Sequence, residues 1–158
     1  QNVENLNEID SDSWDAVLET NLRSIHLLMR AAIPTLEKSN NASVVNIASI
    51  EGHHPARGHS HYSTSKAGLL MLTKSAALEY ADFGIRVNSV SPGLIDDGNL
   101  KERWPEGLNR WLDSAPLRRV GSPKDVANAV VFLSSPMASW ITGSDLVVDG
   151  GVSSSSTW

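Results

Sequence analysis

Hydrophobic residues at helical spacing are the first pattern along this chain, and the pattern begins near Ser11 and Asp12. Acidic residues in that first turn favour the positive end of a helix dipole. The apolar positions that follow recur every three or four residues, which predicts an amphipathic helix. These positions are Trp14, Leu18, Leu22, Ile25, Leu28, Met29 and Ala32. Because a proline removes a helical hydrogen bond, we expect Pro34 to kink or loosen the last turns.

Further helices are expected downstream. One runs from about Ser60 to Asp82 and stops near Gly84, which suits a left-handed cap. Another is expected around 99–113, inside an otherwise irregular segment. The last begins at 122–125, where a serine cap, a proline in the first helical position and an acid in the first turn form a helix start signal.

Short apolar runs lie between these helices and predict strands at 43–48, 85–90 and 146–148. Strands that alternate with helices indicate an α/β fold with parallel strands joined by crossover helices. A sheet of only three strands is small, and one of its edges would be open. From the pattern alone, residues 1–158 are therefore expected to be the back half of a larger α/β domain, with no repeat and no interdomain linker.

Composition narrows the classes of function. The chain has 158 residues with 41% hydrophobic and 20% charged side chains, as in an ordinary soluble globular domain. Its net charge is −5 and its basic residues are scattered, so we expect no nucleic-acid partner. The absence of cysteine excludes disulfides and thiolate chemistry and is compatible with the cytoplasmic location we expect. No apolar run approaches a membrane span and no signal peptide is visible, so we expect no membrane partner.

The strongest chemical signal is Tyr62 with Lys66 four residues later and Ser49 thirteen residues before it. Tyr62 and Lys66 share one helix face, and an ammonium beside a phenol lowers the phenol pKa. Bringing a tyrosine from its usual pKa of about 10 to near neutral takes about 4 kcal/mol of selective phenolate stabilisation. Ser49 follows a predicted strand, where open α/β sheets bind ligands. Together these groups indicate proton transfer to or from a carbonyl or alcohol oxygen.

These residues belong to a longer series of motifs, and the chain resembles the carboxyl-terminal part of a short-chain dehydrogenase/reductase over nearly its whole length. In chain order the motifs are Thr20-Asn21-Leu22, Asn46-Ile47-Ala48-Ser49, Tyr62-Ser63-Thr64-Ser65-Lys66, Arg86-Val87-Asn88-Ser89-Val90-Ser91-Pro92-Gly93, Thr142-Gly143 and Asp149-Gly150-Gly151. Tyr-x-x-x-Lys alone is a weak signal, whereas the whole series in this order is a strong one. The resemblance implies the last three strands of a doubly wound, Rossmann-like parallel sheet.

The same resemblance implies a nicotinamide cofactor, NAD or NADP, and a small-molecule substrate. The glycine-rich turn that holds the dinucleotide in this family is absent from the chain, as is the segment that follows the family's fourth strand. The residue that separates NAD from NADP use is also absent. We therefore expect a fragment or truncated product, and any cofactor binding concerns the parent protein.

The resemblance assigns four catalytic positions. Tyr62 would be the general acid in carbonyl reduction and the base in alcohol oxidation, and Lys66 would lower its pKa and hold the nicotinamide ribose. Ser49 would stabilise charge on the substrate oxygen. Asn21 would mark a helix bend that places a water for proton relay to Lys66. Each position also has a purely structural alternative. Tyr62 would be a core tyrosine and Lys66 a solvated helix lysine, while Ser49 would cap a helix or turn and Asn21 would be a buried amide.

Four positions are expected to meet the cofactor besides Tyr62 and Lys66. Pro92 and Gly93 would pass close to the nicotinamide, where the lack of a side chain permits approach. Ile95 would reach the carboxamide through its main chain. The family commonly has threonine where this chain has Asp97. A carboxylate there would favour the oxidised, positively charged ring over the reduced one.

Two other groups have open interpretations. The histidines at 53, 54, 59 and 61 crowd the loop before Tyr62, but their spacing fits no common zinc pattern, so we predict no metal site and expect some of them at the substrate mouth. Trp104 and Trp111 are seven residues apart. On one helix face they would form an apolar lid over the substrate or simply pack that helix onto the domain.

The leading hypothesis is an NAD(P)-dependent oxidoreductase that acts on a sugar, a polyol or a 3-oxoacyl thioester. The alternatives are a truncated, non-catalytic homologue that serves as a folded interaction module, and a histidine-dependent metal hydrolase. Family members commonly associate through the helices that carry Asn21 and Tyr62 and through the last helix and strand. Leu70, Leu78 and Tyr80 add apolar surface to the Tyr62 helix. A homodimer or homotetramer is therefore expected.

Overall fold

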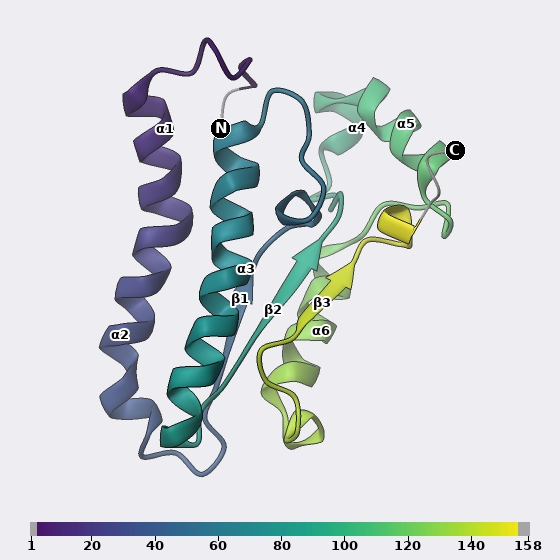
Figure 1. Ribbon diagram of the computed structural model, residues 1–158. Helices are drawn as coiled ribbons and strands as arrows, with labels where there is room; N and C mark the ends of the chain where they lie inside the picture. Colours follow the sequence, from purple (N-terminus) through teal and green to yellow (C-terminus); the bar gives the residue numbers. More distant parts are fainter. Residues whose placement is uncertain (1–2, 155–158) are drawn as a thin grey trace.

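The computed structural model describes residues 3–154 and has one parallel sheet between two layers of helices (Figure 1). Strand β1 is Ser43–Ile47, β2 is Arg86–Pro92 and β3 is Asp145–Val148, in the order β1-β2-β3. Ser43 pairs with Arg86 in the first ladder, and Ser89 with Asp145 in the second. The predicted α/β fold and its three parallel strands are confirmed.

The first helical segment is regular except at one turn. Helix α1 (Ser11–Leu18) begins after Asp10, whose carboxylate accepts a hydrogen bond from the Ser13 amide at 2.7 Å. A π-helical turn, Glu19–Arg23, then leads into helix α2 (Ser24–Leu36). Pro34 lies inside α2, which continues to Leu36, so the irregularity of this segment lies at the π-turn.

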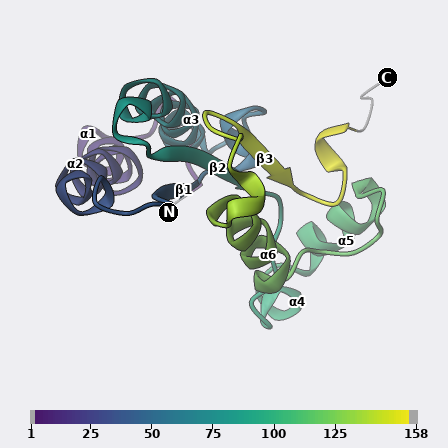
Figure 2. The same cartoon turned by 90° about the horizontal axis from the view of Figure 1, so that it is seen from below.

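Helix α3 (Ser60–Tyr80) covers one face of the sheet together with α2, and helix α6 (Pro123–Ser134) covers the other, as Figure 2 shows. The first face is closed by Met29, Ala42, Ala76, Ala77, Ile85 and Val87. The second is closed by Val90, Ala129, Leu133 and Ala138. Residues three apart on β2 point to opposite faces, so Val87 and Val90 join different clusters. Each face of the central strand is thereby buried.

The ends of α3 and α6 are set by local signals. After α3 a 3₁₀ turn, Ala81–Phe83, reaches Gly84, whose φ of 69° is the predicted left-handed cap. At the start of α6, Ser122 accepts from the Asp125 amide and the Asp125 carboxylate accepts from the Ser122 amide, which is a capping box. Further 3₁₀ turns span Ile50–Gly52, Pro136–Ala138 and Val152–Ser154.

The helix expected at 99–113 is two helices, α4 (Leu100–Arg103) and α5 (Pro105–Ser114). Trp104 interrupts them with φ −152° and ψ 64°, and the following Pro105 cannot supply an amide hydrogen to continue α4. Both helices lie beyond the carboxyl ends of the strands (Figure 1). Pro105 was the available sequence signal for this break, because a proline in the first helical position starts a new helix.

Several apolar positions differ from their predicted surroundings. Leu28, expected on the core stripe, is 65% exposed. Leu70, expected on the outer surface, is buried beside Ala48 and Leu69, whereas Leu78 is 80% exposed. Tyr80 packs against the core. Among the described residues, none of the helices is long and apolar enough to cross a bilayer.

Candidate active site

The candidate residues gather at the carboxyl edge of the sheet, because parallel strands all end on the same side. Ser49 lies two residues beyond β1, Pro92 is the last residue of β2, and Gly93 follows it. Tyr62 and Lys66 lie in the first turns of α3, which begins close to this edge. Helices α4 and α5 lie beyond this edge of the sheet (Figure 1).

Tyr62 is half buried, and its surroundings differ from the expected ones. Burial raises the pKa of Tyr62, a hydrogen bond with Ser49 lowers it, and the Glu51 carboxylate raises it, so the pKa lies above its usual value of 10.0. Lys66 is not among the groups that set this pKa in the structure, and the role predicted for it in lowering the pKa stays a prediction. The ammonium lies over the face of the Tyr62 ring, 5.5 Å from its centre.

Lys66 is held by the end of β1. Its Nζ donates to the Ile47 carbonyl at 2.9 Å. Burial lowers the pKa of Lys66, which is the usual effect of removing an ammonium from water. The contact fixes the lysine beside the strand that delivers Ser49. The Lys66 ammonium is therefore held by the main chain of β1, and its role in the site stays a prediction.

Asn21 lies in the π-turn, so the helical hydrogen-bond pattern is irregular at this position, and the expected bend stays a prediction. Its Nδ2 donates to Ser65 Oγ at 3.1 Å, and Ser65 Oγ donates to the Tyr62 carbonyl at 2.7 Å. The amide thus joins the π-turn to the first turns of α3. Turns of this kind are frequent at functional sites. Relay through a water remains a prediction.

A small cleft of about 220 Å³ opens beside Tyr62. Its walls are Ser49, Ile50, Glu51, Tyr62, Gly93, Leu94, Trp104 and Trp111. Ser49 also accepts from the Glu51 amide at 3.1 Å, so it caps the short 3₁₀ turn as well as facing the cleft. The structure therefore brings Ser49, Tyr62 and Gly93 together around one cavity.

The two tryptophans both line that cleft and both pack on the domain. A Cβ added to Gly93 would lie 2.5 Å from Trp111 Cη2, so only glycine leaves room for this indole. Trp104 is 47% exposed and carries the Arg110 guanidinium 5.6 Å from its ring centre. Trp104 and Trp111 line the cleft, as expected for an apolar lid, and Trp111 also packs against Gly93 of the domain.

Ile95 and Asp97 lie differently with respect to the site. Ile95 lies opposite Gly121 in an isolated parallel bridge. The two hydrogen bonds of this bridge join Gly121 to the Leu94 carbonyl and to the Asp96 amide. The amide and carbonyl of Ile95 itself are therefore not used in the bridge. Asp97 is exposed and pairs with Arg103 at 2.8 Å. Asp97 is not among the residues that line the cleft, and its charge is partly neutralised by the arginine.

The histidine-rich loop is organised by two acids, Glu51 and Asp145. Glu51 lies 3.1 Å from His59 Nδ1 and accepts from Ser63 Oγ at 3.2 Å. Asp145 contacts His53 Nε2 at 2.8 Å. In the described part of the chain no three acidic or histidine side chains converge on a metal-sized site. The position of Glu51 two residues after Ser49 was the available signal for its place in the cleft.

Comparison with known proteins gives the family. Residues 2–153 match the family described as Enoyl-(Acyl carrier protein) reductase. The 2,5-dichloro-2,5-cyclohexadiene-1,4-diol dehydrogenase LinX of Sphingobium indicum is 39% identical over 140 residues, which are 89% of this chain and 56% of LinX. The 3-oxoacyl-[acyl-carrier-protein] reductase FabG of Chlamydia muridarum is 38% identical over 147 residues, 93% of this chain and 59% of FabG. The chain belongs to the short-chain dehydrogenase/reductase family.

Solved structures agree with this family and extend beyond the chain. The ligand-free aldohexose dehydrogenase of Thermoplasma acidophilum superposes with a TM-score of 0.91 at 32% identity, covering 100% of this chain and 66% of that one. An NADPH-bound short chain oxidoreductase of Pseudomonas aeruginosa gives 0.87 at 31% identity, covering 98% and 62%. The chain thus spans less than two thirds of the length of each of these proteins.

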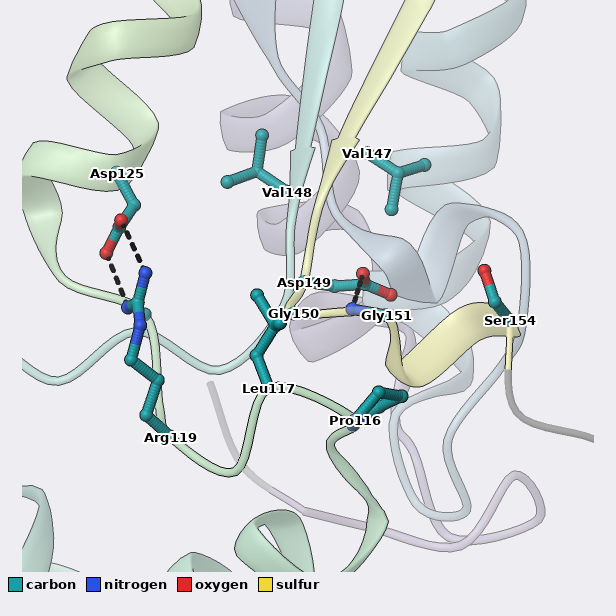
Figure 3. A pocket seen from close by; sticks show the side chains of 11 residues that line it. Pro116, Leu117, Arg119, Asp125, Val147, Val148, Asp149, Gly150, Gly151 and Ser154 are labelled. Atoms are coloured by element: carbon teal, nitrogen blue, oxygen red, sulfur yellow. Dashed lines mark hydrogen bonds and ion pairs between the residues drawn. The ribbon is translucent and has the colours of Figure 1, made fainter.

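In this member of the short-chain dehydrogenase/reductase family, the larger cavity of about 540 Å³ lies apart from Tyr62, at the end of β3 (Figure 3). Its polar groups already satisfy one another. Arg119 holds Asp125 through two nitrogens at 2.8 and 2.9 Å. Burial alone would raise the pKa of Asp149, and hydrogen bonds from Ser153 and Gly151 bring it below its usual value. None of the residues that line this cavity lines the Tyr62 cleft.

Proposed function

We propose that these residues form the carboxyl-terminal part of one Rossmann-like domain in an NAD(P)-dependent oxidoreductase that interconverts a small alcohol and a carbonyl compound. The observation that carries this proposal is the cleft in which the Ser49 and Tyr62 side chains meet at the carboxyl edge of a parallel sheet. The names of the relatives, a diol dehydrogenase and a 3-oxoacyl reductase, support the reaction type.

The residues present fit the nicotinamide end of such a cofactor. The amide and carbonyl of Ile95 are not used in its bridge with Gly121, and the Lys66 ammonium is held by the Ile47 carbonyl one turn of α3 after Tyr62. Ile95 and Lys66 would hold the carboxamide and the ribose, and Pro92 and Gly93 would form the surface between them. Asp97 fits less well, because it is paired with Arg103. When bound, the dinucleotide supplies or accepts the hydride.

The proton chemistry belongs to this chain. Tyr62 Oη would donate its proton to the oxygen of a carbonyl substrate, or accept a proton from an alcohol. The raised pKa keeps the phenol protonated at neutral pH but makes it a weaker proton donor than a tyrosine whose pKa lies near neutral. Ser49 would hydrogen-bond the same substrate oxygen, and Asn21 would hold the π-turn against Ser65.

The test is Tyr62→Phe in the complete protein. The ring remains and only the proton donor is lost, so turnover should fall at least about a hundredfold while cofactor affinity and folding stay intact. Tyr80→Phe is the matched control, since Tyr80 packs against the core away from the cleft. Retention of more than a few per cent of the wild-type kcat by Tyr62→Phe would contradict the proposed role.

A second candidate is a non-catalytic interaction module, and one observation favours it. Within the described residues, β1 pairs only with β2, and Ile47 at its end is 45% exposed. An open strand edge is a docking surface for another strand. A coding sequence that continues upstream into a glycine-rich turn would decide for the enzyme, and one that lacks such a turn would decide for the module.

A further inference from the structure

Glu51 is the one carboxylate in the wall of the Tyr62 cleft. It extends from the 3₁₀ turn that follows Ser49. Its side chain is 21% exposed, so it is accessible to a small ligand but mostly withdrawn from bulk water. A carboxylate at this place is costly to desolvate unless it accepts hydrogen bonds.

The carboxylate is held in a fixed orientation. His59 Nδ1 lies 3.1 Å from both Glu51 oxygens, and Ser63 Oγ donates to Oε2 at 3.2 Å. Both partners belong to the start of α3, the helix that carries Tyr62. Two carboxylate oxygens offer about four acceptor sites, so these contacts leave acceptor capacity for a ligand. Glu51 is therefore a preorganised acceptor beside the proposed proton donor.

The rest of the cleft has a matching character. Trp104 and Trp111 present apolar aromatic surface, and Ser49 and Tyr62 present hydroxyls. Flat aromatic surface next to hydrogen-bonding groups suits the C–H faces and hydroxyls of a carbohydrate-like molecule. An apolar acyl chain pressed against Glu51 would instead remove water from a charge without replacing its hydrogen bonds. A volume of about 220 Å³ also favours a small ligand.

We propose that Glu51, held by His59 and Ser63, accepts a hydrogen bond from a second hydroxyl of the substrate and so selects a small sugar or polyol. This inference rests on the proposed function for the place of the reacting hydroxyl at Tyr62. It makes Glu51 a specificity-determining residue. Among the substrates considered, it favours the polyhydroxylated ones over 3-oxoacyl thioesters.

The experiment compares ribitol with pentan-2-ol, which has the same number of carbons but one hydroxyl. Each is titrated into the complete protein and followed by tryptophan fluorescence, since two tryptophans line the cleft. The wild type should bind ribitol more tightly. Glu51→Ala should weaken ribitol binding at least about tenfold, as expected for loss of a hydrogen bond to a charged group. Glu51→Gln, which keeps the shape, should lose part of that affinity.

Glu106→Gln is the matched control, because Glu106 lies in the first turn of α5 and does not line the cleft. Ribitol binding no tighter than that of pentan-2-ol in the wild type, or equal ribitol affinity in wild type and Glu51→Ala, overturns the inference. Hydride transfer is scored separately with NAD⁺ and NADP⁺. Ribitol bound without turnover contradicts the oxidoreductase and leaves the Glu51 site, whereas turnover of pentan-2-ol with no effect of Glu51 contradicts the site alone.

Discussion

At the scale of single residues, Tyr62 and Glu51 lie in one cleft, and the negative charge of Glu51 disfavours ionisation of the Tyr62 phenol. The motif around Tyr62 predicted which residues would meet, and Ser49 and Gly93 do lie beside it. The motif did not predict the direction of the tyrosine pKa. The direction of the pKa shift depends on burial and on the Glu51 charge. A spacing of four residues in a helix contains no information about either. The spacing of four residues predicts that Lys66 shares a helix face with Tyr62. It does not predict the position of the Lys66 ammonium, which donates to the Ile47 carbonyl.

The ionisation of Tyr62 is a direct test of this balance. Because burial and Glu51 hold its folded pKa above the unfolded value of about 10, the contribution of Tyr62 to stability should be constant below pH about 10 and be lost as pH rises through the folded pKa. Glu51→Gln removes one cause, so ionisation should move to lower pH. The near-ultraviolet absorbance of tyrosinate, measured on residues 1–158 with Tyr80→Phe, reports Tyr62 alone.

Glu106→Gln again serves as the control, since it removes a carboxylate from a helix start outside the cleft. An identical tyrosinate midpoint in wild type and Glu51→Gln would show that the Glu51 charge does not reach the phenol. A midpoint that moves to higher pH would mean that Glu51 helps the phenolate, contrary to the structure.

At the scale of elements, the sequence predicted what local signals determine. The caps at Gly84 and Ser122 lie where their residue types suggest. The break at Trp104 has a local signal in Pro105, whereas the π-turn around Asn21 coincides with a tertiary contact. Trp104 reaches the cleft, and Asn21 bonds to Ser65, forty-four residues away in the chain. The spacing of apolar residues within each helix does not predict either of these contacts.

The capping box of α6 gives a stability prediction. Ser122→Ala removes the side chain that accepts from the Asp125 amide, which should cost about 1 kcal/mol in the free energy of unfolding. Hydrogen bonds from Arg119 and then Ser122 hold the pKa of Asp125 well below its usual range, so this cost should be constant above pH about 4. Urea unfolding followed by circular dichroism measures it.

Ser134→Ala is the control at the other end of the same helix, where no capping contact of the side chain is formed within the described structure. It should change stability by less than about 0.5 kcal/mol. Equal unfolding midpoints for Ser122→Ala and Ser134→Ala would mean that the capping box contributes nothing measurable.

At the scale of the whole molecule, apolar side chains remain on two outer surfaces. Leu78 and Met71 are exposed on α3 (80% and 61%), and Leu28 is exposed on α2. Val131, Met137 and Trp140 are exposed around α6 and the segment before β3. Large exposed apolar side chains gathered on outer helices are typical of association sites. Two such surfaces on one chain suit a homodimer or a homotetramer with two-fold interfaces.

We expect the complete protein to sediment as a dimer or tetramer at micromolar concentration, and Leu78→Glu to shift it to a smaller species. The introduced charge would have to be buried without a partner in the α3 interface. Glu79→Gln, at the neighbouring exposed position, should leave the assembly unchanged. A wild-type protein that sediments as a monomer contradicts the expected self-association.

The last prediction concerns residues 1–158 expressed alone. They contain the cleft and the proton-transfer groups, because Ser49, Tyr62 and Lys66 come from one strand end and one helix. They contain no glycine-rich turn and hence no helix start that would neutralise a pyrophosphate. We expect calorimetry to show NAD(H) and NADP(H) binding no tighter than about millimolar, near the weak end of measurable affinity, and no hydride transfer.

The complete protein, titrated under the same conditions, is the positive control. Circular dichroism of the 158-residue chain must show its helices, so that weak binding is not the result of unfolding. Binding by the short chain as tight as that of the complete protein would mean that the dinucleotide is held by the carboxyl edge of β1 to β3 alone. In that case Lys66, Ile95 and Gly93 would carry the affinity that a phosphate-binding turn supplies in other open α/β sheets.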